Sequence, residues 1–256
     1  MLTIIQLPVL TDNYIYLLHD DESGQTAVVD PALAQPVLSA LSQYGWQLSH
    51  ILVTHHHSDH TGGIAALKAQ TGCTVVAAAA DRQRIGDVDV GVAEDDRVAI
   101  GQHTARVIAT PGHTSGHIVY YFAGDGLLFC GDTLFVMGCG RLFEGTADQL
   151  WASLQKLKGL PPETRIYCTH EYSQSNGRFA LTLEPDNKVL QEKMRWVDQR
   201  RANGLATVPS TLAEELASNP FLRVDSPSVQ KSCAGEGKPA VKVFAAIRHL
   251  KDQFSD

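Results

Sequence analysis

The stretch that decides the fold is Thr-His-His-His-Ser-Asp-His-Thr-Gly-Gly, residues 54–63. It follows an apolar run, so we expect a buried strand over residues 50–54 that leads directly into a His-rich loop. Four side chains of the loop fit the spacing H-x-H-x-D-H, namely His55, His57, Asp59 and His60. A shuffled chain of this composition would contain that spacing about once in a thousand trials. The alternative interpretation is an unspecific His-rich surface tract.

Three more side chains of the same kinds come directly after other apolar strands: His113, Asp132 and His170. Loops at the ends of rigid strands commonly carry functional groups. One such residue alone would usually be an ordinary polar strand terminus. Because four strand ends carry the same side-chain types, we interpret all of them as parts of one metal site. His117 is either a support for one of these ligands or a structural residue, and His56 is expected to point away from its neighbours.

These residues supply five imidazoles and two carboxylates, more ligands than one closed, four-coordinate structural zinc ion needs. Seven ligands suit two ions if Asp132 bridges them. The first ion would then bind His55, His57, His113 and Asp132. The second would bind Asp59, His60, His170 and Asp132.

Imidazoles and carboxylates without a thiolate suit zinc, iron and manganese, and the sequence does not choose between them; zinc is the ion we expect first. Two divalent ions about 3.5–4 Å apart lower the pKa of a shared water toward about 7 and polarise a substrate oxygen. We therefore expect a hydrolase, with Asp132 as the bridge and Asp59 orienting the attacking hydroxide.

Composition excludes several other classes of protein. The 256 residues are 44% apolar and carry a formal charge of −7, with no Lys/Arg-rich run, which argues against a nucleic-acid-binding protein. The chain has no apolar stretch of about 18 residues, so no membrane span is predicted. The five cysteines form no C-x-x-C motif and the first residues lack a basic leader. We therefore expect a cytoplasmic monomer whose partner is a small molecule.

Short strands and occasional helices fill the first two-thirds of the chain, and helical patterns follow. We predict an α/β catalytic domain over residues 1–173 and a small helical domain over residues 174–256. The last helix, over residues 241–254, has an apolar stripe of Val243, Ile247, Leu250 and Phe254. Arg248 and Lys251 flank this stripe, either as cations that meet a substrate carboxylate or as a solvated basic edge.

The motifs T-H-H-H-S-D-H, T-P-G-H-T, G-D-T and T-H-E-Y resemble those of the metallo-β-lactamase superfamily. The resemblance covers about the first 170 residues. It implies a four-layer αβ/βα sandwich with a two-metal site at one edge.

A narrower resemblance covers nearly the whole chain and is to the glyoxalase II family, the hydroxyacylglutathione hydrolases. The motifs that carry it are T-D-N-Y, G-C-G-R-L-F-E-G-T, H-E-Y, N-P-F and R-H-L-K-D, which begin at residues 11, 138, 170, 219 and 248. It implies hydrolysis of S-D-lactoylglutathione and other S-2-hydroxyacylglutathiones to glutathione and a hydroxy acid, a step of methylglyoxal detoxification. It also implies that the helical domain helps to bind glutathione.

The same resemblance implies a set of glutathione-binding residues: Arg141, Tyr172, Arg248 and Lys251. Phe143 stands where the family often has Tyr, so one hydroxyl contact with the substrate is absent. The role of Cys139, between two glycines, stays open.

Other functions on the same scaffold are less well matched. A β-lactamase of the main class would have Cys in place of Asp132, and a nuclease would add basic surface. A diiron oxygen reductase would have Glu in place of His57 and a flavin domain. A lactonase and a non-catalytic metal-binding module stay open as alternatives.

Overall fold

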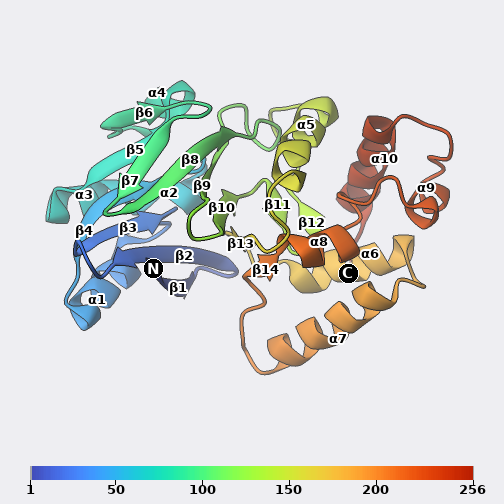
Figure 1. Ribbon diagram of the computed structural model, residues 1–256, viewed down its shortest axis with the longest axis horizontal. Coiled ribbons are helices and arrows are strands. Elements are labelled where there is room, and N and C mark those ends of the chain that lie inside the picture. Colours follow the sequence, from blue (N-terminus) through green and yellow to red (C-terminus); the bar gives the residue numbers. More distant parts are fainter. Residues whose placement is uncertain (1, 256) are drawn as a thin grey trace. The chain divides into compact units, whose positions relative to one another are not determined.

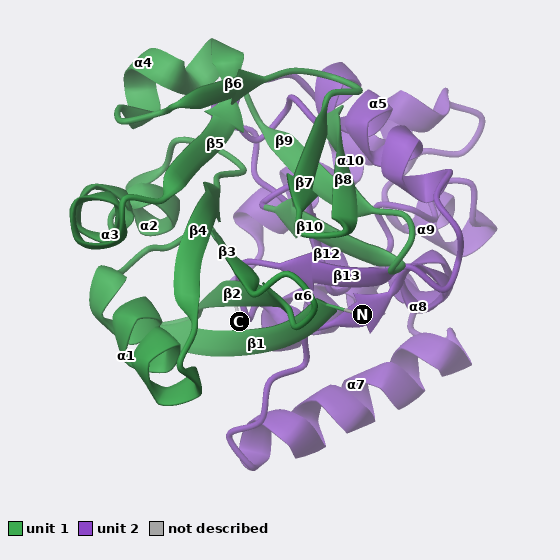
Figure 2. Cartoon of the chain, turned by 60° about the vertical axis from the view of Figure 1, so that its left-hand side comes forward, with its two compact units in different colours: residues 1–109, 116–131 green, residues 110–115, 132–256 purple. Residues whose placement is uncertain are grey.

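The computed structural model describes residues 2–255, which group into two compact units. Unit 1 comprises the chain up to Ala109 together with Gly116–Gly131, and unit 2 comprises Thr110–Ser115 and the chain from Asp132 on (Figure 2). The predicted boundary after residue 173 falls inside unit 2. The division into a catalytic and a substrate-binding domain therefore stays a prediction.

The first sheet of unit 1 has the order β1-β2-β3-β4-β5-β6. Its strands are β1 (Leu2–Val9), β2 (Asn13–Asp20), β3 (Gln25–Val29), β4 (Gln47–Leu52), β5 (Thr74–Ala78) and β6 (Val90–Val92). The first three strands pair antiparallel, and β3 to β6 pair parallel. The parallel strands are joined by short helical segments, which are α1 (Ala34–Tyr44), α2 (Ser58–Thr61), α3 (Ile64–Thr71), a 3₁₀ turn (Ala79–Asp81) and α4 (Arg82–Ile85).

Helices α1 and α3 cover one face of this sheet, because each places apolar side chains on the strands (Figure 1). Val37 and Leu67, from these helices, belong to one buried cluster with Val28, Ile51 and Val75 of the parallel strands. Parallel strands buried in this way end at a common edge, where ligand-binding loops usually lie. In unit 1 this edge carries the ends of β3 and β4, and therefore the His-rich loop.

The second sheet of unit 1 runs β10-β9-β8-β7 and is antiparallel. Its strands are β7 (Arg97–Ile100), β8 (His103–Ala109), β9 (Ile118–Phe122) and β10 (Leu127–Gly131). Tyr120 of β9 joins the two sheets, since its hydroxyl donates to the carbonyl of Val53 at 3.0 Å and also lies 3.2 Å from that of Val76. The expected buried strand before the His-rich loop is thus confirmed as β4, although it covers Gln47–Leu52 rather than residues 50–54.

Unit 2 is mainly helical. Its elements are the hairpin β11 (Leu134–Phe135) and β12 (Gly138–Cys139), the pair β13 (Arg165–Cys168) and β14 (Ser210–Thr211), and the helices α5 (Ala147–Lys158), α6 (Ser173–Leu183), α7 (Lys188–Ala202), α8 (Leu212–Ser218), α9 (Pro227–Ser232) and α10 (Ala240–Gln253). The capping box expected at Thr211 is present, with Glu214 as its second member. No helix among residues 2–255 is long and apolar enough to cross a membrane.

Two details of the last helix differ from expectation. Leu250 is 37% exposed, whereas Phe244 is fully buried, so the buried face of α10 consists of Val243, Phe244 and Ile247. Arg248 also belongs to this face and is only 4% exposed. The predicted stripe was wrong for Leu250. Arg248 lies on the buried face instead, because the carbonyls of Cys139 and Gly140 and the carboxylate of Asp252 bind its guanidinium.

Candidate functional site

The His-rich loop of unit 1 places its imidazoles within a short distance of one another. His55 and His60 are fully buried, and His57 and Asp59 are half-buried. The Nε2 atom of His55 lies 3.0 Å from Nδ1 of His57. Nε2 of His60 lies 3.6 Å from Oδ2 of Asp59. The H-x-H-x-D-H spacing therefore brings donor atoms of all four residues to one end of unit 1.

The buried carboxylate of Asp30 organises this loop, and the sequence interpretation gave it no role. Its Oδ1 accepts the backbone N–H of Thr54 at 2.8 Å, and its Oδ2 accepts the Thr54 hydroxyl at 2.6 Å. Oδ2 also accepts Nδ1–H of His60 at 3.0 Å. A carboxylate bound to Nδ1 fixes the tautomer, so Nε2 of His60 is the nitrogen that can ligate a metal. The only sequence signal was an Asp directly after an apolar strand.

Asn13, part of the T-D-N-Y motif, holds Asp59. Its amide donates to Oδ2 of Asp59 at 3.1 Å and to the Asp59 backbone carbonyl at 3.2 Å. The contact spans 46 residues of sequence, so local spacing could not reveal it. The carboxylate of Asp59 is thereby oriented before any substrate binds.

Two further histidines of unit 1, His56 and His117, contact the same loop through different neighbours. His56 directs Nδ1 toward Oδ2 of Asp81, 3.5 Å away, but its ring also meets that of His57, with centroids 4.9 Å apart. The expectation that it points away from both neighbours is therefore wrong for His57. The ring of His117 stacks on that of His55, with centroids 4.8 Å apart and planes 22° from parallel. His117 thus packs against a predicted ligand.

Unit 2 brings together the other three predicted ligands. Nε2 of His113 and Nε2 of His170 each lie 3.4 Å from the same oxygen, Oδ2 of Asp132. His113 is oriented by Nδ1, which donates to the carbonyl of Arg141 at 2.9 Å. His170 is held by stacking on Tyr172, with centroids 4.8 Å apart and planes 1° from parallel. One oxygen between two imidazoles is the arrangement expected of a bridging carboxylate.

The spacing of these donor atoms fits divalent metal ions. Zinc–nitrogen and zinc–oxygen bonds of about 2.0–2.1 Å in a tetrahedron place neighbouring ligand atoms about 3.3–3.4 Å apart. The distances within each set range from 3.0 to 3.6 Å. Imidazoles and carboxylates without a thiolate suit zinc, iron and manganese alike.

A pocket of about 310 Å³ lies in unit 2 next to Asp132 and His113. Its walls contain all five residues predicted to bind substrate, which are Arg141, Phe143, Tyr172, Arg248 and Lys251. Phe135, Cys139, Ser175 and Asn176 complete the lining. The role of Cys139 was left open, and the other three were not predicted to bind substrate, since nothing in their local sequence marks them as pocket residues.

Arg248 and Lys251, the two cations of α10 that line the pocket, differ in burial: Arg248 is buried and Lys251 is half-buried. Nη1 of Arg248 donates to the carbonyl of Cys139 at 2.9 Å, and Nη2 lies 2.9 Å from Asp252. Lys251 directs Nζ to the hydroxyl of Ser175 at 2.8 Å. Arg248 is therefore part of the buried wall rather than a solvated basic edge.

Two other lining residues differ in their chemistry. Phe143 is 62% exposed and meets the ring of His113 edge-on, with centroids 5.1 Å apart. Burial raises the pKa of the Cys139 thiol to about 11, although Arg248 beside it acts in the opposite direction. Cys139 is consequently a neutral thiol at physiological pH and not a nucleophile.

Comparison with known proteins decides the family. The metallo-beta-lactamase superfamily model matches residues 10–170, and the hydroxyacylglutathione hydrolase C-terminus model matches residues 171–254. A protein of Methylococcus capsulatus named hydroxyacylglutathione hydrolase is 56% identical over 99% of both chains. The chain belongs to the hydroxyacylglutathione hydrolase family. A Rhodospirillum rubrum protein with the same name is 54% identical, again over 99% of both chains.

Solved structures place this hydroxyacylglutathione hydrolase family member in the expected fold class. The BLEG-1 B3 metallo-beta-lactamase superposes with a TM-score of 0.68 at 23% identity, covering 86% of this chain and 99% of its own. ETHE1 from Myxococcus xanthus superposes with a TM-score of 0.66 at 28% identity, covering 97% and 98%. The predicted class, a metal-dependent hydrolase of the α/β metallo-β-lactamase fold with a helical C-terminal region, is confirmed.

Proposed function

We propose that the protein hydrolyses the thioester bond of S-2-hydroxyacylglutathiones, with S-D-lactoylglutathione as its main substrate, to glutathione and D-lactate. One observation carries the proposal: a single pocket joins two predicted metal ligands, His113 and Asp132, to three cationic side chains. The full-length relatives named hydroxyacylglutathione hydrolase support the same substrate class.

The pocket suits the charge of glutathione. The tripeptide carries two carboxylates and one ammonium group, so it needs local cations on a protein whose formal charge is −7. Arg141, Arg248 and Lys251 provide them, and an Arg guanidinium can bind a carboxylate through two parallel hydrogen bonds. Tyr172 and Phe143 add aromatic surface to the lining of the same pocket.

The proposal includes two divalent ions, zinc first and iron or manganese as alternatives. The residues that would hold them are His55, His57, Asp59, His60, His113, Asp132 and His170, with Asp132 as the shared ligand. When bound, such ions supply a water of lowered pKa and polarise the carbonyl of the thioester.

The protein's own side chains prepare the reaction. Asn13 fixes the carboxylate of Asp59, which can therefore orient the attacking water. The carbonyl of Arg141 fixes His113, while its guanidinium lines the pocket, so one residue couples the metal ligands to substrate binding. Arg248 and Lys251 line the same pocket as Asp132, so cations that bind the peptide part of the substrate would leave its thioester carbonyl close to Asp132.

The proposed setting is the cytoplasm. All five cysteines of the chain are free thiols, as expected of a protein from a reducing compartment. The absence of a long apolar helix among the described residues is compatible with this setting. The monomeric state and the lack of nucleic-acid or membrane partners stay predictions.

The test is a hydrolysis assay on the metal-loaded protein, with S-D-lactoylglutathione run beside a lactone and a β-lactam. We expect fast loss of the thioester absorbance and slow or no turnover of the other two substrates. Asp132→Asn should abolish turnover, whereas Asp148→Asn, at an exposed position of α5, should leave it unchanged. A thioester rate equal to that of buffer would overturn the proposal, and turnover of the lactone alone would favour a lactonase.

A further inference from the structure

The hairpin of β11 and β12 forms one wall of the pocket, through Phe135 and Cys139. Met137 in its turn has a φ of 55°, the left-handed region that residues other than Gly rarely adopt. Such a backbone persists only where its surroundings hold it. The contacts that hold this hairpin therefore decide the shape of the wall.

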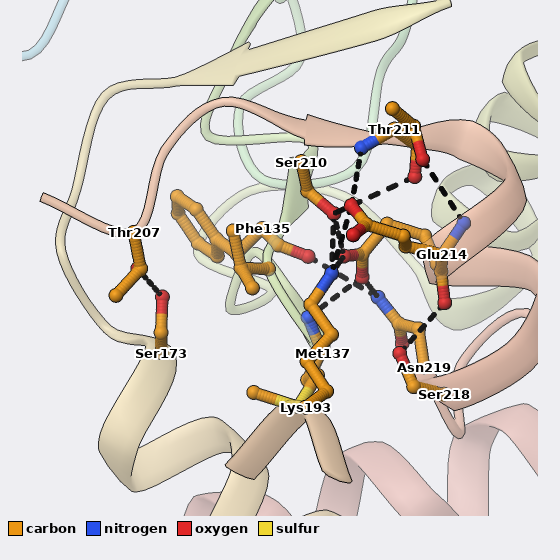
Figure 3. A network of polar contacts seen from close by, with 12 residues as sticks. Phe135, Met137, Ser173, Lys193, Thr207, Ser210, Thr211, Glu214, Ser218 and Asn219 are labelled. Carbon is orange, nitrogen blue, oxygen red and sulfur yellow. Dashed lines mark hydrogen bonds and ion pairs between the residues drawn. The ribbon is translucent and has the colours of Figure 1, made fainter. Parts of the chain in front are cut away.

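The first support comes from α8, outside the pocket lining (Figure 3). Oε2 of Glu215 accepts the backbone N–H of Met137 at 2.7 Å. The amide of Asn219 donates to the carbonyl of Gly138 at 3.0 Å and to that of Phe135 at 3.2 Å. Glu215 and Asn219 are fully buried, and they also bind each other at 3.0 Å.

The charge of Glu215 is compensated from α7. Nζ of Lys193 lies 3.0 Å from Oε1 of Glu215, and its exposed fraction is 8%. Ser210 donates its hydroxyl to the same oxygen at 2.6 Å. The two oxygens of this carboxylate thus bind different groups, since Oε1 meets Lys193 and Ser210 whereas Oε2 meets the hairpin and Asn219.

The second support comes from α10. Arg248 donates Nη1 to the carbonyl of Cys139 at 2.9 Å and to that of Gly140 at 3.4 Å. These carbonyls belong to the last residue of β12 and the residue after it, so the hairpin holds one side of the Arg248 guanidinium, while Asp252 of the same helix holds the other. A displacement of the turn at Met137 would move the carbonyls and the guanidinium together.

We propose that Glu215 and Asn219 are positioning residues for substrate binding: they fix the β11–β12 hairpin and, through the carbonyls of Cys139 and Gly140, set the place of Arg248. The inference rests on the proposed function of the same pocket. Neither residue lines the pocket, so both act through the hairpin.

The first experiment compares two double variants that both remove the buried charges. Lys193→Met with Glu215→Gln keeps an acceptor for Met137 and Asn219, and Lys193→Met with Glu215→Leu does not. Removing both partners of a buried ion pair often leaves stability unchanged, whereas removing one partner leaves a lone buried charge, so both variants change Lys193 and Glu215 together. We expect the Leu variant, which lacks the acceptor for Met137 and Asn219, to raise KM for S-D-lactoylglutathione about tenfold, and the Gln variant to keep KM within twofold of the wild type.

The second experiment is a double-mutant cycle with Arg248. Asn219→Ala should raise KM about tenfold in the wild-type background and less than twofold in the Arg248→Ala background, because both act on one binding contact. The matched control is Asn187→Ala. The side chain of Asn187 likewise donates and accepts hydrogen bonds within unit 2, donating to Ala217 and Glu184 and accepting from Leu190, but it has no such bond with the hairpin. It should leave KM unchanged.

Glutathione binding by calorimetry should follow the same pattern as KM, while kcat and metal content stay near wild type. Thermal unfolding of every variant reports whether it is folded. Equal KM effects of Asn219→Ala in both backgrounds, or equal KM for the Gln and Leu variants, would overturn the inference and leave the proposed function intact. A wild-type protein without thioesterase activity would overturn the proposed function instead.

Discussion

Asp30→Asn is expected to weaken metal binding while preserving the fold. In the wild-type protein the carboxylate accepts three hydrogen bonds, from the Thr54 amide, the Thr54 hydroxyl and Nδ1–H of His60. An Asn side chain can still accept the Thr54 amide through Oδ1. Its NH₂ group then faces His60 and donates to Nδ1, which moves the imidazole proton to Nε2, the nitrogen needed by the metal.

The magnitude follows from the number of contacts that change. Loss of a group that orients a metal-binding His typically costs 10–100-fold in affinity, or about 1.4–2.7 kcal/mol. Asp30→Ala would instead leave three buried donors without an acceptor, at about 1–3 kcal/mol each, and would threaten folding. The Asn variant therefore isolates the tautomer effect.

The assay is competition for zinc between the metal-free protein and a chromophoric chelator, with thermal unfolding measured in parallel. Asp81→Asn is the matched control, since Asp81 is also fully buried and faces His56, which is not a predicted ligand. It should retain the zinc affinity of the wild type. Wild-type affinity in Asp30→Asn, or an equal loss in both variants, would refute the reasoning.

Three further predictions concern pH, thiol reactivity and specificity. Burial by itself raises the pKa of Glu184, but hydrogen bonds from Arg223 and Ser226 outweigh it and hold the pKa below its ordinary value of 4.5. This stabilisation is present above pH 4.5 and is lost as the pH falls through the folded-state pKa. In Glu184→Gln, the free energy of unfolding in urea should therefore fall less steeply at acid pH than in the wild type. An unchanged slope would contradict this. At pH 8, iodoacetamide should alkylate Cys139 far more slowly than the half-buried Cys233, and the rate at Cys139 should rise toward pH 11. Peptide mass spectrometry measures both rates. Equal rates at pH 8 would contradict the burial of Cys139. Phe143→Tyr should lower KM for S-D-lactoylglutathione severalfold by adding a hydroxyl at the pocket rim, with kcat little changed, and a higher KM would argue against that contact.

Local sequence patterns predicted the elements of the site whose chemistry lies in adjacent residues. The strand before the His-rich loop, the H-x-H-x-D-H spacing and the capping box at Thr211 are each visible within about ten residues. The convergence of His113 and His170 on Asp132 was also expected, because each follows a strand. These three residues are His or Asp side chains that directly follow an apolar strand, a pattern that can be recognised in the sequence alone.

Contacts between distant segments could not be predicted in this way. Asn13 meets Asp59 across 46 residues, and Arg248 meets Cys139 across 109. The expected apolar stripe of α10 counted Leu250 as buried and treated Arg248 as a flank, whereas the hairpin carbonyls draw Arg248 inward. Periodicity tells which residues share a helix face, but the neighbours of that face decide which of them is buried.

Gly131, the last residue of β10, packs against the start of the His-rich loop, which carries four of the predicted metal ligands. Its φ is 48°, and a Cβ atom there would lie 2.4 Å from the Thr54 hydroxyl oxygen and 2.9 Å from Nε2 of His117. The backbone of Gly131 therefore packs closely against Thr54 at the start of the His-rich loop, and the Asp30 carboxylate binds the same residue. Because peptide and carboxylate groups shape this loop, we expect it to keep its conformation when one divalent ion replaces another, so zinc, iron and manganese should all bind without refolding.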